Sequence, residues 1–316
     1  MANDLERSGG HHPRVVVVIP NWNLKNDLSE CLDTLSKSTY PNLEVVVVDN
    51  ASSDGSAAHL AQNYPWVTLV ALSENSGYAG GINAGIRAVW AQQPDYILAL
   101  NNDTLLPEDT ITALVQTAES DPGFGIIAPK IFYHPSRDRI FSLGDRVYKF
   151  WPVAVRYAVK AKNRPAFDRL MEFDYVIGCA MLIRAQVIRE IGLFDTSFFM
   201  FFEDSDFCRR ARDAGWRVIR DGRISIFHKA SLSVRKVKPQ MTRLRARNRI
   251  RFYRRYRHGP LPLLTQVALL AGTLFKVLGF FFSGQWAAIP VYLRGTLEGL
   301  REGKVPARGT ELPVLG

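Results

Sequence analysis

The sequence predicts an α/β fold, in which a mostly parallel β-sheet is covered by helices on both faces. Two observations lead to this prediction. The runs VVVVIP (Val15–Pro20) and LEVVVVDN (Leu43–Asn50) are apolar at successive positions, as in strands that are buried on both faces. Segments with apolar residues at helical spacing alternate with such runs, and this alternation is typical of strand–helix–strand units.

The elements of this fold follow in order along the first 120 residues. After the first strand, apolar residues from Leu24 to Leu35 recur at helical spacing and predict a helix. The second strand is followed by an SSDGS turn and a short helix near 56–63. A strand over 67–72, a helix over 80–92, a strand over 95–103 and a helix over 107–120 complete the alternation.

The pattern becomes less regular after about residue 125. Residues 134–175 are aromatic and basic without a clear period, so they predict a long excursion or lid. A strand and a helix follow in YVIGCAMLIRAQVIREIG, then a helix over 204–215 and two short strands, WRVIR and ISIFH. A basic helix over about 240–257 and an apolar tail from residue 259 end the chain as a helical extension.

Cysteine content and charge narrow the class of protein. The three cysteines form no CxxC pair, which excludes a disulfide framework and a thiolate zinc site and favours a reducing compartment. The N-terminus has no apolar run, so no signal peptide is predicted. The net charge of +10 resides in one segment, because residues 235–258 carry eleven Lys and Arg and no acid.

Polar residues follow all four N-terminal strands, in PNWN, DNASSDGS, SENSGYAGG and NND. One such stretch is typical of a turn, but the carboxyl ends of parallel strands meet at one sheet edge, where ligands bind. Four together favour nucleotide binding, with Asp49 able to accept from a base or ribose and Asp103 able to hold a cation against a diphosphate. GxGxxG and GxxxxGK[ST] are absent after the first strand, which argues against a dinucleotide site and a P-loop.

A cluster of acids follows an aromatic run in FFMFFEDSDFCRR, which spans residues 198–210. One interpretation is the start of a helix, where acids oppose the helix dipole. The other is a catalytic carboxylate placed beside an apolar wall. Asp206 also has the spacing for an ion pair with Arg210 on the same helix.

These motifs together resemble a known enzyme family. VVVVIPNWN, VVVVDNASSDGS, ENSGYAGGINAGI, LALNNDTLLPED and GLFDTSFFMFFEDSDFCRRARDAGW are similar, in this order, to the motifs of inverting glycosyltransferases of family 2. The similarity is strongest to the rhamnosyltransferase-like branch and extends from about Arg14 to Ser231. It implies the GT-A fold, a Rossmann-like sheet flanked by helices.

The resemblance also implies roles for individual residues. Asp204 would be the general base, and Asp103 with His228 would bind a divalent cation, Mg²⁺ or Mn²⁺; Asn101 stands where the family's motif has its first Asp. The acceptor would meet Gly178, Glu203 and Asp206. The residues expected to bind the nucleotide-sugar are Pro20, Asn21, Asn23, Asp49, Asn50, Ser52, Asp54, Asn75, Gly77, Gly80, Gly81, Asn83, Asn101, Asn102 and Asp103.

Two of these regions have simpler alternatives. His228 could be an ordinary histidine at a strand end, and Cys179 is better explained as a small buried thiol than as a nucleophile.

We expect a flexible N-terminus over 1–13, a catalytic domain over 14–232 and a helical C-terminal region over 233–316. Within the domain, residues 14–125 would form the nucleotide-binding half and residues 126–232 the acceptor half.

The implied reaction moves a sugar, with rhamnose as the candidate, from a dTDP- or UDP-sugar to a saccharide acceptor. The resemblance further implies an acceptor on a polyprenyl diphosphate, in cell-envelope polysaccharide synthesis. One rival is a sugar-1-phosphate nucleotidylyltransferase, but PNWNLKNDL lacks the Gly-rich, basic signature expected after its first strand. The other is a non-catalytic, Arg-rich RNA-binding protein, because RLRARNRIRFYRRYRHG interleaves arginines with aromatic residues.

The apolar tail favours a membrane surface over nucleic acid as the partner of the basic segment. Residues 259–275 and 277–293 are uncharged runs of seventeen, each short of the ~20 residues of a membrane span. Helices in the membrane interface, preceded by arginines that bind anionic lipids, fit residues 235–300. The expected location is therefore cytoplasmic and peripheral, at the inner face of the membrane. The rival expectation is a tail that forms a homodimer interface or packs on the catalytic domain.

Overall fold

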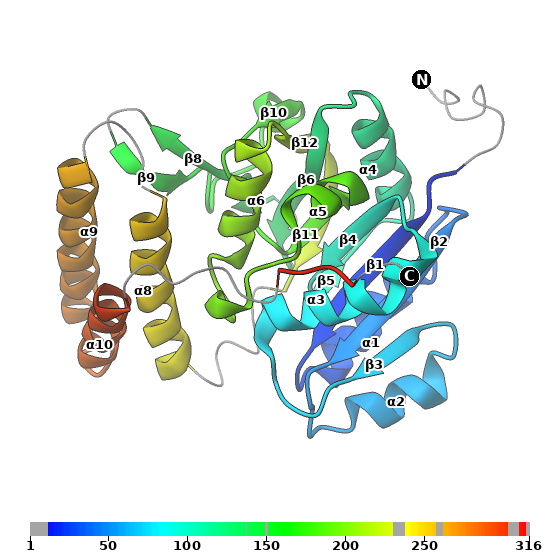
Figure 1. The fold of residues 1–316 in the computed structure, drawn as a ribbon, viewed down its shortest axis with the longest axis horizontal. Coiled ribbons are helices and arrows are strands. Elements are labelled where there is room, and N and C mark those ends of the chain that lie inside the picture. The colour runs from blue at the N-terminus through cyan, green and yellow to red at the C-terminus, as the bar shows by residue number, and fades with distance from the viewer. Residues whose placement is uncertain are drawn as a thin grey trace.

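One large sheet organises the molecule (Figure 1). The computed structural model describes residues 12–136, 138–148, 151–229, 238–256, 262–302 and 310–313. The strand order is β10-β12-β6-β11-β4-β1-β2-β3. The strands are β1 (Val15–Asn21), β2 (Leu43–Asp49), β3 (Thr68–Ala71), β4 (Tyr96–Leu100), β6 (Phe124–Tyr133), β10 (Leu170–Glu172), β11 (Ala180–Arg184) and β12 (Arg217–His228).

Strands β4, β1, β2 and β3 are parallel, as the alternating pattern predicts. Strand β11 runs antiparallel to both β4 and β6, and β12 runs parallel to β6. Along β1, Val16 and Val18 belong to one core and Val15, Val17 and Ile19 to the other. The apolar runs are therefore buried on both faces, which is why every position in them is apolar.

Helices cover the two faces of this sheet. Helices α1 (Lys25–Leu35) and α4 (Thr110–Glu119) contribute to the core that holds Val15 and Val17, and α3 (Gly77–Val89) and α6 (Glu203–Asp213) to the other core. The remaining helices of this half are α2 (Ser56–Asn63) and α5 (Ala185–Ile191). Helix α3 begins at Gly77 rather than at the predicted residue 80, so the glycine-rich motif forms the first turn of the helix.

Two parts of the predicted secondary structure were wrong. WRVIR and ISIFH form one strand, β12, because its pairing with β6 continues across an irregularity between Asp221 and Ser225. Residues 134–175 are not an irregular excursion, since they contain short strands that extend the sheet or form a hairpin. These are β7 (Ile140–Ser142), β8 (Asp145–Tyr148), β9 (Trp151–Arg156) and β10.

Three helices follow at the far end of the molecule from β3: α8 (Lys238–Arg255), α9 (Pro262–Phe282) and α10 (Ala288–Arg301) (Figure 1). Lys276 lies within α9 instead of separating two short segments. Over Leu263–Phe282 this helix is long and apolar enough to cross a membrane, which corrects the expectation that no segment is. Core helices of soluble proteins can have the same length and composition.

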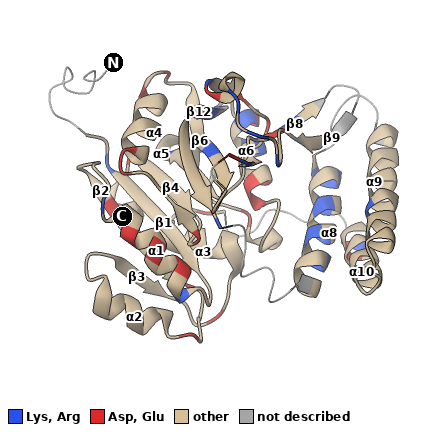
Figure 2. Cartoon of the chain, turned by 180° about the vertical axis from the view of Figure 1, so that it is seen from behind, with Lys and Arg blue, Asp and Glu red and all other residues tan. Residues whose placement is uncertain are grey.

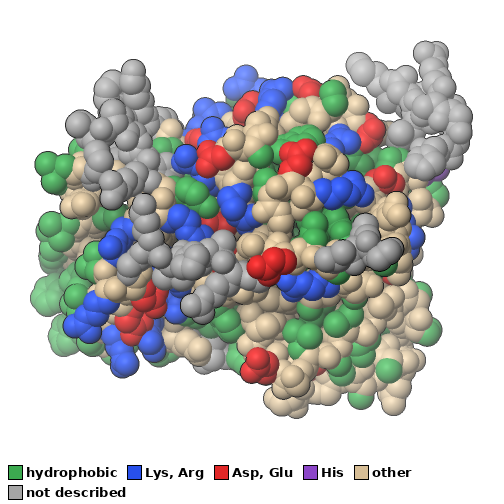
Figure 3. All heavy atoms as spheres, in the orientation of Figure 1, with side chains coloured by type: hydrophobic (Ala, Val, Ile, Leu, Met, Phe, Trp, Pro, Cys, Tyr) green, Lys and Arg blue, Asp and Glu red, His purple; other side chains and the backbone are tan. Residues whose placement is uncertain are grey.

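Large apolar side chains of α9 face outward. Leu270, Phe275 and Phe282 are 72%, 79% and 81% exposed, and Trp286 in the following turn is 65% exposed. Figure 3 shows apolar side chains gathered at this end of the molecule. An exposed patch of this kind marks a surface that meets a membrane, a ligand or another protein.

Helix α8, which carries many of the chain's arginines, lies between the sheet-containing half of the molecule and helices α9 and α10 (Figure 2). Several bind residues of this chain: Arg243 pairs with Glu298 at 2.7 Å, Arg251 with Glu302 at 3.2 Å and Arg255 with Asp195 at 2.7 Å. Many of the arginines in the described part of the basic segment therefore bind other parts of the same chain. This differs from the predicted lipid-binding surface and equally disfavours an RNA-binding role.

Candidate active site

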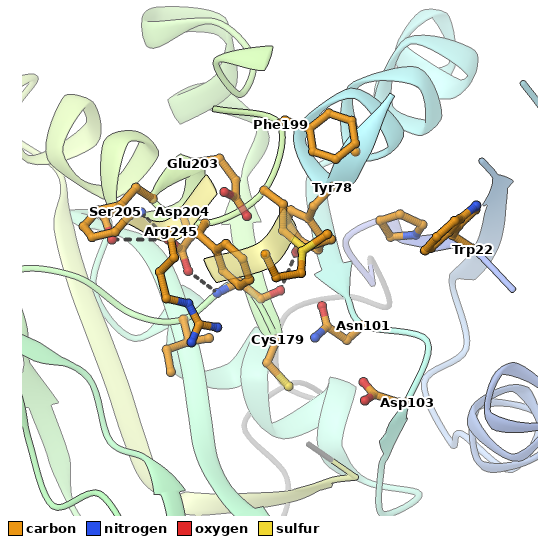
Figure 4. A pocket seen from close by; sticks show the side chains of 18 of the residues that line it. Trp22, Tyr78, Asn101, Asp103, Cys179, Phe199, Glu203, Asp204, Ser205 and Arg245 are labelled. Atoms are coloured by element: carbon orange, nitrogen blue, oxygen red, sulfur yellow. Dashed lines mark hydrogen bonds between the residues drawn. The ribbon is translucent and has the colours of Figure 1, made fainter. Parts of the chain in front are cut away.

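A cavity of about 800 Å³ opens where the strand ends, the start of α6 and the C-terminal helices meet. Most of the predicted site residues line it. They are Pro20, Asn21, Asn50, Asn75, Gly77, Asn101, Asn102, Asp103, Gly178, Glu203, Asp204 and His228. Figure 4 shows Asp204 and Glu203 on one side of the cavity and Asn101, Asp103 and Trp22 on another.

Hydrogen bonds between loops join the ends of β1, β2 and β4. The amide of Asn102 donates to Asn21 Oδ1 at 2.7 Å, and the amide of Asn21 lies 3.3 Å from Asp49 Oδ1. Asp49 Oδ2 accepts from the backbone N–H of Ser52 at 3.0 Å. Asp49 and Ser52 lie outside the cavity lining and support the residues that form it.

Other predicted nucleotide-binding residues also lie behind the cavity wall. Asn23 Oδ1 accepts from the Ser53 backbone at 2.7 Å, and Asp54 accepts from the backbone N–H of Lys25 at 2.9 Å, so both hold the loops after β1 and β2. Asn83 binds the backbone of Phe194 through both its amide nitrogen and its oxygen. Asn83 is fully buried and binds the protein backbone, whereas a contact with the donor was predicted.

The glycines of α3 allow close packing. A Cβ on Gly81 would lie 2.8 Å from Asn50 Nδ2 and 2.9 Å from Pro20 Cβ, and a Cβ on Gly80 would lie 2.5 Å from Ser76 Cβ. Gly81 and Gly80 do not line the cavity but set the position of residues that do. Gly77 has a φ of +75°, and a Cβ there would lie 2.3 Å from the carbonyl oxygen of Phe199.

Asp103 and His228 form the candidate metal-binding pair. His228 Nε2 lies 2.9 Å from Asp103 Oδ1, both side chains are 4% exposed, and the Asn101 amide lies 3.3 Å from the same nitrogen. Burial by itself lowers the pKa of His228, but Cys179 and the hydrogen bond with Asp103 raise it well above its ordinary value. Nδ1 of this ring is buried without a hydrogen-bond partner.

A carboxylate and an imidazole at one point of the cavity fit a divalent cation. Among the described residues, no group of three or more His, Cys, Asp or Glu side chains is placed to hold an ion. A cation at Asp103 and His228 would therefore take further ligands from water or from phosphate oxygens, as Mg²⁺ does in phosphate sites.

Asp204 stands at the start of α6 and faces the cavity. Its Oδ2 accepts from the backbone N–H of Gly178 at 3.0 Å, and its Oδ1 accepts from the backbone N–H of Ser205 at 2.7 Å. The Ser205 hydroxyl also donates to Oδ1, at 3.2 Å, so Oδ2 is the oxygen that can accept a further hydrogen bond. The carboxylate is thus held in one orientation while it can still accept a proton from a bound hydroxyl.

The neighbouring Glu203 differs in its environment. It is 5% exposed, and its Oε2 has no hydrogen-bond partner. Burial, and then the charges of Asp204 and Asp206, raise the pKa of Glu203 well above its ordinary value. A protonated Glu203 at the cavity wall can donate a hydrogen bond to a ligand but cannot act as a base.

Asp206 does not reach the cavity. It is fully buried, and its carboxylate binds Arg210 at 2.9 Å, Arg255 at 2.8 Å and the hydroxyl of Tyr256 at 2.7 Å. The pair with Arg210 agrees with the sequence spacing. The predicted contact with an acceptor is not present in this arrangement, because the carboxylate is enclosed by these three partners.

The loop before α6 has an unusual backbone. Phe199, Phe201 and Phe202 have φ values of +64°, +71° and +73°, a conformation that costs about 1–3 kcal/mol for each such residue. Asn248 of α8, fully buried, donates from its amide nitrogen to the carbonyls of Phe198, Met200 and Phe201 at 2.7, 2.9 and 3.0 Å. Helix α8 therefore holds the loop that leads into Asp204.

Several residues of the cavity wall were not predicted from the sequence: Trp22, Tyr78, Phe141, Asp145, Gln240, Arg245 and Arg249. Trp22 stands within PNWN, and its position between two singled-out asparagines was a usable signal. The two arginines belong to the basic segment that was attributed to lipid head groups. Asp145 carries no signal in the sequence, because it lies in the segment without a clear period.

The comparison that decides the family is a match of residues 12–254 to the family model described as "Glycosyltransferase like family 2". The match covers the sheet, the cavity-forming loops and most of α8.

This chain belongs to glycosyltransferase family 2.

Relatives of this glycosyltransferase agree with that result. An N-acetylglucosaminyl-diphospho-decaprenol L-rhamnosyltransferase of Mycobacterium tuberculosis is 29% identical over 213 residues, covering 60% of this chain and 67% of the relative. A low-salt glycan biosynthesis hexosyltransferase of Haloferax volcanii is 28% identical over 199 residues, covering 62% and 61%. The chain thus spans about two thirds of the length of these relatives.

Solved structures support the fold. A mannosyltransferase of Pyrobaculum calidifontis in complex with GDP-Man and Mn²⁺ matches with a TM-score of 0.57 and 18% identity, over 93% of this chain and 88% of that one. GalNAc-T7 with UDP, GalNAc and Mn²⁺ matches with a TM-score of 0.56 and 14% identity, over 78% and 49%. The predicted GT-A fold is confirmed.

The raised pKa of Glu203 predicts a pH dependence of stability. The folded protein binds the Glu203 proton more tightly than the unfolded chain does, and this tighter binding stabilises the folded state. The stabilisation is complete below the ordinary glutamate pKa of 4.5 and is lost progressively as pH rises above it. Relative to Glu203→Gln, the wild-type glycosyltransferase should lose at most about 1.4 kcal/mol of unfolding free energy per pH unit, measured by urea denaturation. Glu190→Gln is the control with the opposite sign, because hydrogen bonds from Gln186 and Trp216 lower the pKa of Glu190. A difference for Glu203→Gln that does not change with pH would contradict the assignment.

The contacts of Asn248 predict that replacing this residue slows catalysis, although it does not belong to the proposed reacting groups. Asn248→Asp replaces a donor by a carboxylate beside three carbonyl oxygens, which should displace the Phe198–Phe202 loop. We expect kcat to fall roughly a hundredfold, with the donor KM nearly unchanged. Asn63→Asp, at an exposed position at the end of α2, is the matched control. Unchanged kcat in a folded Asn248→Asp protein would show that the loop does not depend on this residue.

Proposed function

We propose that this chain transfers a sugar, with inversion, from a nucleotide-diphosphate sugar to a saccharide acceptor carried on a polyprenyl diphosphate. The observation that carries the proposal is the arrangement of one cavity, with a backbone-held carboxylate, Asp204, on one side and the Asp103–His228 pair on another. A base and a site for a leaving diphosphate are the two groups that such a displacement requires.

In the proposed reaction an acceptor hydroxyl attacks the anomeric carbon as the nucleoside diphosphate leaves. Asp204 takes the hydroxyl proton as the new bond forms, and Glu203, while protonated, orients the acceptor by donating a hydrogen bond. Asp103 and His228 would hold Mg²⁺ or Mn²⁺, which when bound neutralises charge on the leaving diphosphate. No covalent intermediate is needed, so the buried Cys179 has no chemical role.

The strand ends are the proposed donor site. Pro20, Asn21, Asn50, Asn75 and Gly77 line the cavity near Asn101 and Asp103, and polar groups of this kind suit a ribose and a diphosphate. We propose dTDP or UDP as the nucleotide and rhamnose as the sugar. The name of the M. tuberculosis relative supports rhamnose as the sugar, and the solved neighbour with UDP supports a pyrimidine nucleotide.

The proposed acceptor is lipid-linked, and the proposed location is the cytoplasmic face of the membrane. The relative's name specifies N-acetylglucosaminyl-diphospho-decaprenol, which supports the acceptor class. The exposed apolar side chains of α9 support attachment to a membrane surface. The proposed role is synthesis of a cell-envelope polysaccharide.

Replacement of Asp204 tests the proposed base. Asp204→Asn should lower kcat by about 10²–10⁴-fold, because general base catalysis is lost while the shape of the side chain is kept. Binding of the donor nucleotide, measured by thermal stabilisation with UDP or dTDP and Mn²⁺, should remain. Asp213→Asn, at the exposed end of α6, is the matched control. Full transfer activity of Asp204→Asn would refute the assignment of the base.

A further inference from the structure

The cavity extends beyond Asp204 to the C-terminal helices. Its wall continues through Arg245 and Arg249 of α8, then Gly272, Phe275 and Lys276 of α9. The part of this wall that the described residues of α8, α9 and α10 form contains three cations and no carboxylate. No step of the proposed transfer reaction uses these cations.

Each of the three cations is held by neighbouring groups. Arg245 is exposed, with its guanidinium carbon 4.1 Å from the centre of the Phe201 ring, and Figure 4 shows it on the same side of the cavity as Asp204 and Ser205. Arg249 donates from Nη2 to the Leu269 carbonyl at 2.7 Å and to Thr273 Oγ1 at 2.6 Å. The ammonium of Lys276, also exposed, lies 5.1 Å from the centre of the Phe280 ring.

Gly272 lets Arg249 approach the α9 wall of the cavity. A Cβ at Gly272 would lie 2.9 Å from Arg249 Nη1, so a larger residue there would push the guanidinium away. Nε of Arg249 is buried without a hydrogen-bond partner. The charge is thus fixed in place at the cavity wall, and little side-chain freedom is lost when an anion binds.

An apolar surface begins where the cations end. Phe275 lines the cavity and is 79% exposed, and Leu270, Leu274 and Leu278 continue the same outward side of α9 with exposures of 72%, 59% and 43%. From the start of α6 to the outward side of α9, the surface therefore carries the carboxylate of Asp204, then the three cations, then exposed hydrocarbon. A molecule with a sugar, an anion and a lipid chain in that order matches it.

We propose that Arg245, Arg249 and Lys276 bind the diphosphate of the lipid-linked acceptor, with its saccharide toward Asp204 and its hydrocarbon chain along Phe275 and the outward side of α9. This inference rests on the proposed function, because it names the binding site of the acceptor in that reaction. Each phosphate of such a diester is negatively charged at neutral pH. A guanidinium group can donate two parallel hydrogen bonds to the oxygens of one phosphate. No covalent step is involved.

The ion pairs that arginines of α8 form within the chain favour the lipid-linked diphosphate over anionic lipid head groups as the ligand. Arg243, Arg251 and Arg255 bind carboxylates of the chain itself, so they do not form a flat basic face with the other three cations. Arg245, Arg249 and Lys276 instead line a cavity that also holds the proposed base. A ligand that enters the cavity reaches them together.

Binding of farnesyl diphosphate to the full chain tests the inference without transfer activity. EDTA is present, so that no cation assists binding at Asp103 and His228, and affinity is measured by calorimetry. We expect farnesyl diphosphate to bind more tightly than either inorganic pyrophosphate or farnesol, because it engages both the cations and the apolar surface. The double variant Arg245→Gln/Lys276→Gln should weaken binding about tenfold or more.

The matched control is Arg294→Gln, an exposed arginine of α10 outside the cavity, which should change the affinity by less than about twofold. Arg245→Lys/Lys276→Arg, which keeps both charges, should restore most of the binding. Equal affinity of the wild type and the double Gln variant would overturn the inference, as would equal binding of pyrophosphate and farnesyl diphosphate. If the double Gln variant no longer sediments with phosphatidylglycerol vesicles but still binds farnesyl diphosphate, the cations bind lipid head groups and the inference is overturned.

Failure of this inference and failure of the proposed function are distinguishable. The proposed function fails if no dTDP- or UDP-sugar with Mn²⁺ stabilises the wild-type protein against heat. The inference concerns the other end of the cavity and fails on the farnesyl diphosphate result alone.

Discussion

The hydrogen bonds of Asn248 to the Phe198–Phe202 loop are the constraint on which the active site depends. Three phenylalanines of this loop have left-handed backbone conformations, which are unfavourable for bulky side chains. One buried amide binds three of the loop's carbonyls and stabilises the loop in this conformation. The loop in turn fixes the start of α6, so that Asp204 accepts from the backbone N–H of Gly178 at the cavity wall. Gly77 completes the arrangement, because only glycine leaves room for the Phe199 carbonyl.

The same contacts make α8 a part of the active site. Asn248 holds the loop, Arg255 binds Asp195 and Asp206 on either side of it, and Arg251 donates to the Ser197 carbonyl at 2.7 Å. The family match, which runs to residue 254, includes most of this helix. A domain boundary at residue 232 therefore stays a prediction, and these contacts argue that α8 works together with the residues before it.

The sequence predicts what depends on local pattern. Continuous apolar runs identify the buried strands, and polar residues after them mark the edge where Asn21, Asn50 and Asp103 meet. The ion pair of Asp206 with Arg210 follows from helical spacing alone. The pairing of Asp103 with His228 joins residues 125 positions apart, and only the resemblance to a family suggested it.

Other features depend on contacts that no local pattern encodes. The sequence places Glu203, Asp204 and Asp206 on one helix turn, but their environments diverge because α8 covers Asp206, Gly178 holds Asp204 and the cavity wall buries Glu203. The basic segment has the composition of a lipid-binding or nucleic-acid-binding surface. Its arginines instead serve as internal ties or line the cavity, depending on which partner each meets in the fold.

A double-mutant cycle tests most directly whether Asn248 acts through Asp204. We would measure kcat/KM for transfer by the wild type, Asn248→Asp, Asp204→Asn and the double variant. If Asn248 acts by positioning Asp204, its replacement should have little further effect once Asp204 is asparagine, so the two losses are strongly non-additive. Fully additive losses would contradict the account, because they would show that Asn248 and Asp204 contribute independently.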